Sequence, residues 1–244
     1  MHENLKKVLD NSARIVFLGG AGISTESGIP DFRSETGLYA SMSKYGISPE
    51  EILSHSFFMA KPNIFYQYYK ENLIHPDAKP NAAHFALARL EAQGKLTAIV
   101  TQNVDGLHQM AGSKNVIQVH GTANRHYCIG CDTDYDLDYV LNPKVRAEHV
   151  PLCETCNGII RPDVVFFGES LDPQAIYAAT DAIANADTLI VGGTSLVVYP
   201  VAGFVNYFKG DNLIVINKSK TASDSKAQIV IHDSIGAVLG SVVD

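Results

Sequence analysis

All four cysteines of the 244-residue chain lie in two close pairs, a spacing that is typical of a metal site. Cys128 and Cys131 form the first pair, Cys153 and Cys156 form the second, and 21 residues separate the pairs. Two residues between paired thiolates let the backbone wrap one corner of a tetrahedron, so two such pairs can supply four sulfur ligands to one zinc ion. Two local disulfides or redox pairs are the alternative. Because no cysteine is left over, we predict one closed, structural zinc site.

A glycine-rich turn follows the first hydrophobic run of the chain. In Gly19-Gly-Ala-Gly-Ile-Ser-Thr25 the backbone is bare enough for amide N–H groups to meet a phosphate at the start of a helix. The dinucleotide-binding fingerprint is incomplete, because Thr25 stands where its third glycine would be and no strand ends in an acidic residue about 20 positions later. An ordinary tight turn is therefore an equal alternative. In the next loop, Gly28-Ile-Pro-Asp-Phe-Arg33, Pro30 breaks any helix, and the loop could close over a bound phosphate or ring.

Polar side chains follow several other predicted strands. Thr101-Gln-Asn-Val-Asp-Gly-Leu-His108 leaves one strand, and His120 follows the next. Gly192-Gly-Thr-Ser195 and Asn217 end two later strands and offer partners for ribose hydroxyls. A histidine with an ordinary pKa of about 6.5 suits general acid–base work, although a hydrogen-bonded histidine at a strand end is the simpler interpretation of His120 taken alone. In a doubly wound sheet, all these groups would face the ligand crevice.

The elements that must position these groups alternate between strand and helix. Short β-branched runs predict buried parallel strands at Ile15–Leu18, Leu96–Thr101, Val116–Val119, Thr188–Val191, Leu213–Ile216 and Ile229–Ile231. Helical periodicity predicts helices at Ala82–Gln93, after an Asn81 cap, and at Pro173–Asn185 and Val201–Phe208. This alternation predicts an α/β fold: a doubly wound, Rossmann-like parallel sheet with a smaller zinc-binding and helical lobe.

Two segments interrupt the alternation, and we expect them to form the small lobe of a single catalytic domain, residues 1–244. The first insertion, 37–80, is expected to be helical, and the second, 127–160, carries the cysteines. Residues 1–36, 81–126 and 161–244 would then form the large lobe. The first insertion is rich in aromatic residues at helical spacing, which favours a lobe core over a ligand site. These residues are Phe57, Phe58, Phe65, Tyr66, Tyr68 and Tyr69.

Composition limits the class of protein and its partners. A hydrophobic content of 46% is enough to bury a sizeable core, whereas a net charge of −7 argues against a sequence-independent grip on nucleic acid. The amino terminus has no apolar stretch typical of a signal peptide, and no run of 18 apolar residues occurs. We therefore expect a cytoplasmic protein that binds neither nucleic acid nor membrane, and we expect it to be a monomer.

The order of these motifs resembles that of the sirtuins, the NAD-dependent protein lysine deacylases. In length, the chain resembles a bacterial, single-domain member of that family. The resemblance covers almost the whole chain. It rests on Gly20-Ala-Gly-Ile-Ser, Gly28-Ile-Pro-Asp-Phe-Arg, Thr101-Gln-Asn-Val-Asp-Gly-Leu-His, His120-Gly, both Cys-x-x-Cys pairs, Phe166-Phe-Gly-Glu169, Gly192-Gly-Thr-Ser-Leu-Val-Val-Tyr-Pro200 and Ile216-Asn217.

The resemblance implies NAD as co-substrate and a role for each matching residue. Phe32 and Arg33 would belong to a loop that orders over NAD, Val104 and Asp105 would hold the nicotinamide amide, and His120 would be the general base. Asn103 would act beside His120 in catalysis. The implied cofactor-binding residues are Gly20, Ala21, Gly22, Ser24, Thr25, Phe32, Arg33, Gln102, Asn103, Val104, Asp105, His120, Gly193, Thr194, Ser195, Asn217, Lys218 and Ser234.

The resemblance also implies that the substrate is an acetylated lysine in a protein, bound as a strand between two segments of the chain. Backbone pairing of this kind reads little sequence. The implied substrate residues are Phe32, Val164, Val165, Phe167, Gly168, Glu169, Val197 and Val198. Relatives that prefer succinyl or malonyl groups carry a Tyr-x-x-Arg pair after the mobile loop. Because no arginine lies between Arg33 and Arg89, we expect neutral acyl groups, acetyl first.

The implied reaction transfers the acetyl group from lysine to ADP-ribose and releases nicotinamide. Transfer of ADP-ribose to a protein acceptor from the same NAD site is the alternative function. A dehydrogenase should carry a fuller glycine fingerprint with an acidic ribose partner, and a zinc-ribbon binding module leaves the polar clusters at the strand ends unexplained.

Overall fold

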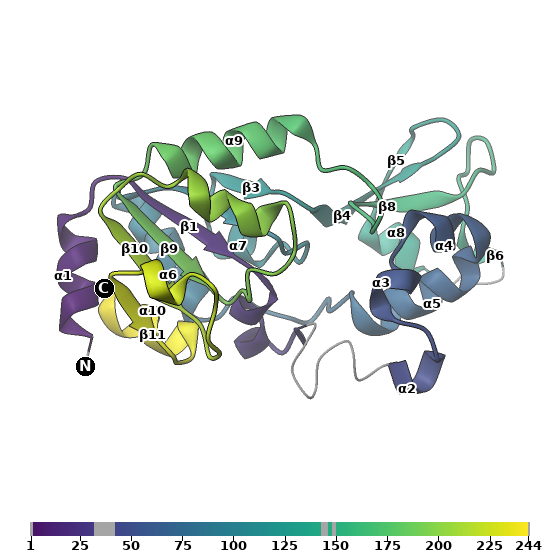
Figure 1. Ribbon diagram of the computed structural model, residues 1–244. Helices are drawn as coiled ribbons and strands as arrows, with labels where there is room; N and C mark the ends of the chain where they lie inside the picture. Colours follow the sequence, from purple (N-terminus) through teal and green to yellow (C-terminus); the bar gives the residue numbers. More distant parts are fainter. Residues whose placement is uncertain (1, 32–41, 143–145, 148–149, 244) are drawn as a thin grey trace.

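A six-stranded parallel sheet forms the centre of the large lobe (Figure 1). The computed structural model describes residues 2–31, 42–142, 146–147 and 150–243. All five residues of strand β1 are buried, as expected for a strand that helices cover on both faces. The strands of this sheet are β1 (Ile15–Gly19), β2 (Leu96–Thr101), β3 (Val116–Gln118), β9 (Thr188–Gly192), β10 (Asn212–Ile216) and β11 (Ile229–Ile231). All six predicted strands are confirmed, with bounds that differ by at most one residue.

The strand order reverses beside β1, and this reversal creates the crevice of the fold. The order is β11-β10-β9-β1-β2-β3, so the chain builds the sheet outward from β1 in one direction and then in the other. The loops that leave the carboxyl ends of β1 and β9 therefore diverge to opposite faces, and ligands of such sheets bind in the crevice between them. This is the doubly wound topology predicted from the sequence.

Helices cover both faces of the sheet, and the alternating side chains of the strands pack against them. In β1, Ile15 and Phe17 face the layer formed by α1 (Glu3–Asn11), α6 (Ala82–Ala92) and α10 (Ile235–Val242). Val16 and Leu18 face the other layer, α9 (Pro173–Ala184) and the 3-10 helix η5 (Val201–Tyr207). The predicted cap of α6 is confirmed, because the Asn81 side chain accepts a hydrogen bond from the Ala83 N–H at 2.9 Å.

The segment after Pro200 departs from the sequence prediction in one respect. We predicted an ordinary helix over Val201–Phe208, whereas residues Val201–Tyr207 form the tighter 3-10 helix. Two β-branched valines and Gly203 lower the α-helix propensity of this short stretch. The predicted helix after Asp172 is confirmed, with Asp172 accepting a hydrogen bond from the Gln174 N–H at 2.9 Å.

Four short helices and a second sheet form a separate body with its own core, which we call the small lobe. The helices are α2 (Met42–Tyr45), α3 (Pro49–Ile52), α4 (His55–Ala60) and α5 (Pro62–Asn72). The antiparallel sheet has the order β5-β4-β8, with β4 (Gly121–Cys128), β5 (Asp134–Asp136) and β8 (Ile160–Val164). This sheet extends beyond the range 127–160 at both ends. Helix α8 (Leu137–Leu141) and the short strands β6 (Arg146–Ala147) and β7 (Val150–Pro151) complete the lobe.

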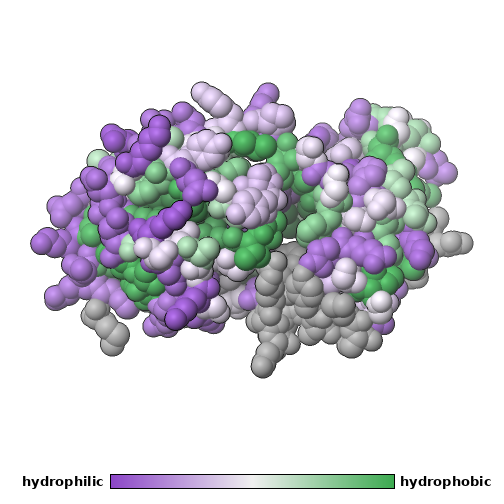
Figure 2. All heavy atoms as spheres, in the orientation of Figure 1, coloured by the Kyte–Doolittle hydropathy of each residue, from purple (hydrophilic) through white to green (hydrophobic). Residues whose placement is uncertain are grey.

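The aromatic residues of α4 and α5 form the core of the small lobe, as predicted. The rings of Phe58 and Phe65 meet edge to face with centroids 4.9 Å apart, and both rings approach Phe166. The six predicted aromatic residues are all buried. Figure 2 shows apolar side chains on both sides of the hollow between the two lobes. Within the part of the chain that the structure describes, no helix is both long enough and apolar enough to cross a membrane.

Candidate active site and zinc site

Two glycine turns cross at the switch point of the sheet, and their backbones are in direct contact. The Gly22 N–H donates a hydrogen bond to the Gly193 carbonyl at 2.8 Å. A Cβ atom at Gly193 would lie 2.3 Å from the Ile23 nitrogen, and Gly193 has a φ of +60°. Only glycine meets both demands without strain. The contact brings the turn after β1, which includes the 3-10 helices η1 (Ala21–Ile23) and η2 (Thr25–Ser27), against the turn after β9.

Side chains from the end of β2 fix the same crevice through a chain of hydrogen bonds. The Ser24 hydroxyl donates to Asp105 Oδ2 at 2.7 Å and accepts from Asn103 Nδ2 at 3.1 Å. Gln102 Nε2 donates to Thr194 Oγ1 at 3.0 Å. Asp105 Oδ1 also accepts from the Leu107 N–H at 2.9 Å, which starts the short helix α7 (Leu107–Met110). Hydrogen bonds therefore hold the predicted polar side chains in two groups, one of Ser24, Asn103 and Asp105 and one of Gln102 and Thr194.

His120 follows β3 at this edge of the sheet and has a defined tautomer. Its Nδ1 lies 3.0 Å from the Gln102 carbonyl oxygen. A carbonyl oxygen only accepts hydrogen bonds, so Nδ1 carries the proton and the neutral ring keeps an unprotonated Nε2. Burial lowers the pKa of His120, and the hydrogen bond to Gln102 opposes this effect. A neutral imidazole with a free Nε2 can accept a proton near neutral pH.

The segment from Val164 to Glu169 lies beside His120 and is joined to it through the backbone. The Val165 N–H donates to the His120 carbonyl at 3.0 Å. On the other side of the segment, the Phe167 N–H donates to the Leu53 carbonyl at 3.0 Å. Segment 164–169 therefore spans from the histidine of the large lobe to α3 and α4 of the small lobe.

All these groups line one cavity of about 1120 Å³ between the two lobes. It is lined by most of the residues that we predicted for NAD and substrate. They are Gly20, Ala21, Gly22, Ser24, Thr25, Gln102, Asn103, Val104, Asp105, His120, Val164, Val165, Phe167, Gly168, Glu169, Gly193, Thr194, Ser195, Val198, Asn217 and Lys218. Ser234 and Val197 are not lining residues, although Asp233, Ile235 and Val198 beside them are. Phe32 and Arg33 fall outside the described residues.

Sequence reasoning missed the walls that the small lobe contributes to this cavity. Phe65 and Tyr69 of α5 line the cavity, although the sequence assigned them only to the lobe core. The Tyr69 hydroxyl lies 3.1 Å from His126 Nε2, and both side chains are buried. Helical spacing indicated that these aromatic side chains are buried, but it carries no signal for the one edge of α5 that also meets the crevice.

The four cysteines form a cluster that fits one zinc ion. Their sulfur atoms all lie within 4.8 Å of one another, as the spacing of the two pairs predicts. The N–H of Gly130 donates to Cys128 Sγ at 3.3 Å, and the Tyr135 hydroxyl donates to Cys153 Sγ at 3.1 Å. Donors of this kind stabilise and orient thiolate ligands. The cluster lies at the far end of β4, away from the lining of the cavity.

Comparison with known proteins identifies the family. A model described as the Sir2 family matches residues 20–200, which include the glycine turn, His120 and all four cysteines. The chain belongs to the Sir2 family.

Two named relatives match almost the whole length of this chain. A protein of Clostridium perfringens named NAD-dependent protein deacetylase is 58% identical over 241 residues, which cover 98% of this chain and 97% of the relative. A protein of Staphylococcus epidermidis with the same name is 48% identical, with 99% and 96% covered.

Solved Sir2 structures share the fold of this family member. A Sir2 variant with a deacetylated p53 peptide and 3'-O-acetyl ADP-ribose has a TM-score of 0.89 and 40% identity, covering 97% of this chain and 95% of the other. A Sir2 with p53 peptide and NAD+ has a TM-score of 0.87 and 40% identity, with 99% and 96% covered.

Proposed function

We propose that this chain is an NAD-dependent protein lysine deacetylase, which transfers the acetyl group from acetyl-lysine to ADP-ribose and releases nicotinamide. One observation carries the proposal: the glycine turns, His120 and segment 164–169 line the same cavity of about 1120 Å³. The names of its relatives and the acetyl ADP-ribose bound to a similar Sir2 support it.

NAD would bind at the switch point of the sheet, with its diphosphate against the glycine turns. Bound there, NAD supplies a ribose carbon that an acyl oxygen can attack as nicotinamide leaves. Gly22 and Gly193 keep side chains out of the crossing, so the backbone can approach the ligand. Ser24, Asn103 and Asp105 form a ready-made set of donors and acceptors near the turn, while Thr194, Ser195 and Asn217 line the part of the cavity expected to hold adenosine.

His120 would act as the general base. Its Nδ1 proton is held by the Gln102 carbonyl, which leaves Nε2 free to take a proton from a ribose hydroxyl. Asn103 would hold the ribose next to this imidazole. The substrate peptide would lie along segment 164–169, whose Val165 N–H is bonded to the His120 carbonyl. This hydrogen bond would fix the position of the bound peptide relative to the base.

The zinc ion would be structural. Its four cysteine ligands leave no open position for water or substrate, and their cluster contributes no residue to the cavity. We also propose that the protein is a cytoplasmic monomer that binds no nucleic acid. A reducing compartment keeps the thiols available for zinc.

The test is incubation of the purified chain with NAD and an acetylated peptide, followed by mass spectrometry. We expect the peptide to lose its acetyl group as nicotinamide and acetyl-ADP-ribose appear in equal amounts. A mass gain of ADP-ribose on protein without loss of acetyl would support the alternative, protein ADP-ribosyl transfer. Formation of NADH would contradict both.

A further inference from the structure

We propose that Arg161 is a positioning residue for the acetylated peptide, because it holds segment 164–169 in the shape that pairs with substrate. The inference rests on the proposed function. Arg161 lies in β8, behind the segment and outside the lining of the main cavity, and only 8% of its surface is exposed.

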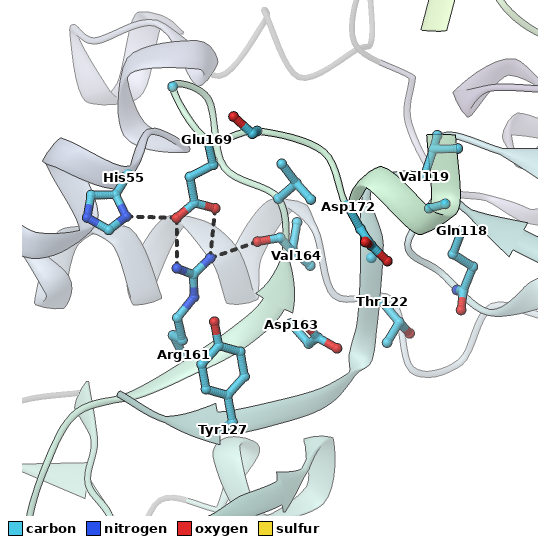
Figure 3. Close-up of a pocket in the computed structure, with 15 residues that line it drawn as sticks. His55, Gln118, Val119, Thr122, Tyr127, Arg161, Asp163, Val164, Glu169 and Asp172 are labelled. Atoms are coloured by element: carbon cyan, nitrogen blue, oxygen red, sulfur yellow. Dashed lines mark hydrogen bonds and ion pairs between the residues drawn. The ribbon is translucent and has the colours of Figure 1, made fainter. Parts of the chain in front are cut away.

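The guanidinium of Arg161 forms a bidentate ion pair, here called the fork, with the carboxylate of Glu169 (Figure 3). Nη1 donates to Glu169 Oε1 at 2.8 Å and Nη2 donates to Oε2 at 2.9 Å. Nη2 also donates to the Val164 carbonyl at 2.9 Å. The Arg161 Cζ atom stacks over the Phe166 ring, 4.2 Å from its centroid. One side chain therefore contacts the beginning, the middle and the end of segment 164–169.

Glu169 closes the segment into a turn, and Arg161 keeps the carboxylate in place. Glu169 Oε2 accepts a hydrogen bond from the Phe166 N–H at 2.8 Å, while the Glu169 N–H donates to the Phe166 carbonyl at 3.0 Å. Gly168, within this turn, has a φ of +88°. The turn is thus closed by two hydrogen bonds, one of which depends on the position of a side chain.

The same carboxylate ties the turn to the small lobe. Glu169 Oε1 lies 2.7 Å from His55 Nδ1, at the start of α4. The His55 N–H donates to the Phe167 carbonyl at 3.1 Å. His55, Arg161 and Glu169 line one side of a second cavity of about 790 Å³ (Figure 3).

The ionisation of Glu169 depends on its ion pair with Arg161 and on its other hydrogen bonds. Burial alone would raise the pKa of Glu169, but hydrogen bonds from Arg161, the Phe166 N–H and His55 outweigh it and lower the pKa to about 2. Glu169 is therefore ionised at neutral pH. Replacement of either partner would leave the other charge partly buried and unpaired.

Two backbone groups of the segment are left for a partner, and both belong to residues of the main cavity wall. Within the described residues, the Gly168 N–H and the Val165 carbonyl have no hydrogen-bond partner. Both residues line the main cavity. An extended peptide pairs most tightly with such groups when their spacing is fixed beforehand, because ordering a flexible turn costs binding free energy.

The test compares Arg161→Lys, Arg161→Met and Glu169→Gln with the wild type. We expect KM for an acetylated peptide to rise at least ten-fold in Arg161→Met and Glu169→Gln, and less in Arg161→Lys, whose single ammonium keeps the charge but cannot make the fork. We expect KM for NAD to stay within about two-fold and kcat at saturating peptide within about three-fold, because the bond from Val165 to His120 is retained.

Arg125→Gln is the matched control. Arg125 is also an ion-paired arginine of the small lobe, with Asp163 at 2.9 Å and Asp134 at 2.6 Å, but among the described residues it forms no hydrogen bond or ion pair with segment 164–169. Its KM for peptide should stay within two-fold. Thermal unfolding and zinc content show which variants are folded. If Arg161→Met does not fold, Arg161→Lys and Glu169→Gln provide the comparison with the wild type.

The outcomes separate this inference from the proposed function. Binding of a fluorescent acetylated peptide, measured by anisotropy, reports the segment without turnover. Ten-fold weaker peptide binding in folded variants supports the inference, whether or not the wild type deacetylates the peptide. Absence of deacetylation by the wild type would contradict the proposed function alone. Unchanged peptide binding, or a lowered kcat with unchanged KM for peptide, overturns the inference.

Discussion

At the scale of the residue, His120 carries the sharpest chemical expectation. We predict that His120→Ala keeps NAD binding within about two-fold and lowers kcat by about 10²- to 10⁴-fold, the range that one general base contributes. The measurement is nicotinamide release with an acetylated peptide, together with NAD binding by calorimetry. Retention of most of the activity would remove His120 from the role of base.

Sequence reasoning reached the residues that end strands but not the ones that support them. His120, Gln102 and Asn103 were found because polar side chains directly after buried strands are unusual. Arg161 carried no such signal, because it sits inside a strand and its importance depends on contact with Glu169, eight positions later. Spacing along the chain cannot show which side chains meet across a fold, so partners of this kind require the structure.

At the scale of the element, helix α5 forms part of the wall of the main cavity. It contributes Phe65, Tyr69 and Asn72 to the wall of the main cavity. Among the described residues that line this cavity, Lys218 is the single lysine or arginine, and it follows β10, where adenosine is expected. A succinyl carboxylate would therefore be buried without a cation.

We predict that succinyl-lysine is turned over with a kcat/KM at least about 100-fold below that of acetyl-lysine. An unpaired buried carboxylate costs several kcal/mol, and about 2.7 kcal/mol corresponds to this ratio. Competition between an acetylated and a succinylated peptide of the same sequence gives the ratio directly. Equal turnover would show that a cation outside the described residues reaches the acyl group.

The two cysteine pairs of the zinc site are the second element, and they have a separate test. We predict that Cys153→Ala loses its zinc and unfolds at a lower temperature, because structural zinc binding is coupled to folding. Thr155→Ala is the control, since Thr155 lies between two ligands and offers Cys153 only its backbone N–H. Metal content and thermal unfolding should change in the first variant alone. A stable, active, metal-free Cys153→Ala protein would contradict the structural role.

The regular elements were predictable where local pattern and packing agree, as in the six strands and α6. Helix α10 was not predicted, because Gly236 and Gly240 lower its helix propensity. The structure gives their reason: a Cβ at Gly236 would lie 2.5 Å from Glu26 Oε2, and one at Gly240 would lie 3.0 Å from the Ala82 Cβ. The two glycines allow α10 to pack closely against η2 and α6. This packing stabilises the helix and can be seen only in the folded structure.

At the scale of the whole molecule, two buried histidines link stability to pH. His84 of α6 and His108 of α7 are buried, with ring centroids 4.8 Å apart. Burial lowers the pKa of His84 to about 4, and burial together with the charge of His84 lowers the pKa of His108 to about 3. Within the described residues, both nitrogens of His108 and Nε2 of His84 lack hydrogen-bond partners. The folded protein therefore keeps both rings neutral well below pH 6.5.

We predict that the free energy of unfolding falls as pH decreases from about 6.5 toward 4. In this window the unfolded chain binds protons at ordinary histidine pKa values while the folded protein does not, at up to about 1.4 kcal/mol per pH unit for each ring. Urea unfolding of the wild type and of His108→Phe at several pH values measures the slope. The variant should lose about half of the slope due to this pair, and identical slopes would contradict the prediction.

The bond from the Val165 N–H to the His120 carbonyl has a consequence for protein engineering. It joins segment 164–169 to His120 through main-chain atoms alone. The hydrogen bond between the segment and His120 therefore does not involve the side chain of Phe167, which is exposed. We expect that position 167 can be randomised to change which peptides the enzyme prefers, while the hydrogen bond to His120 is kept.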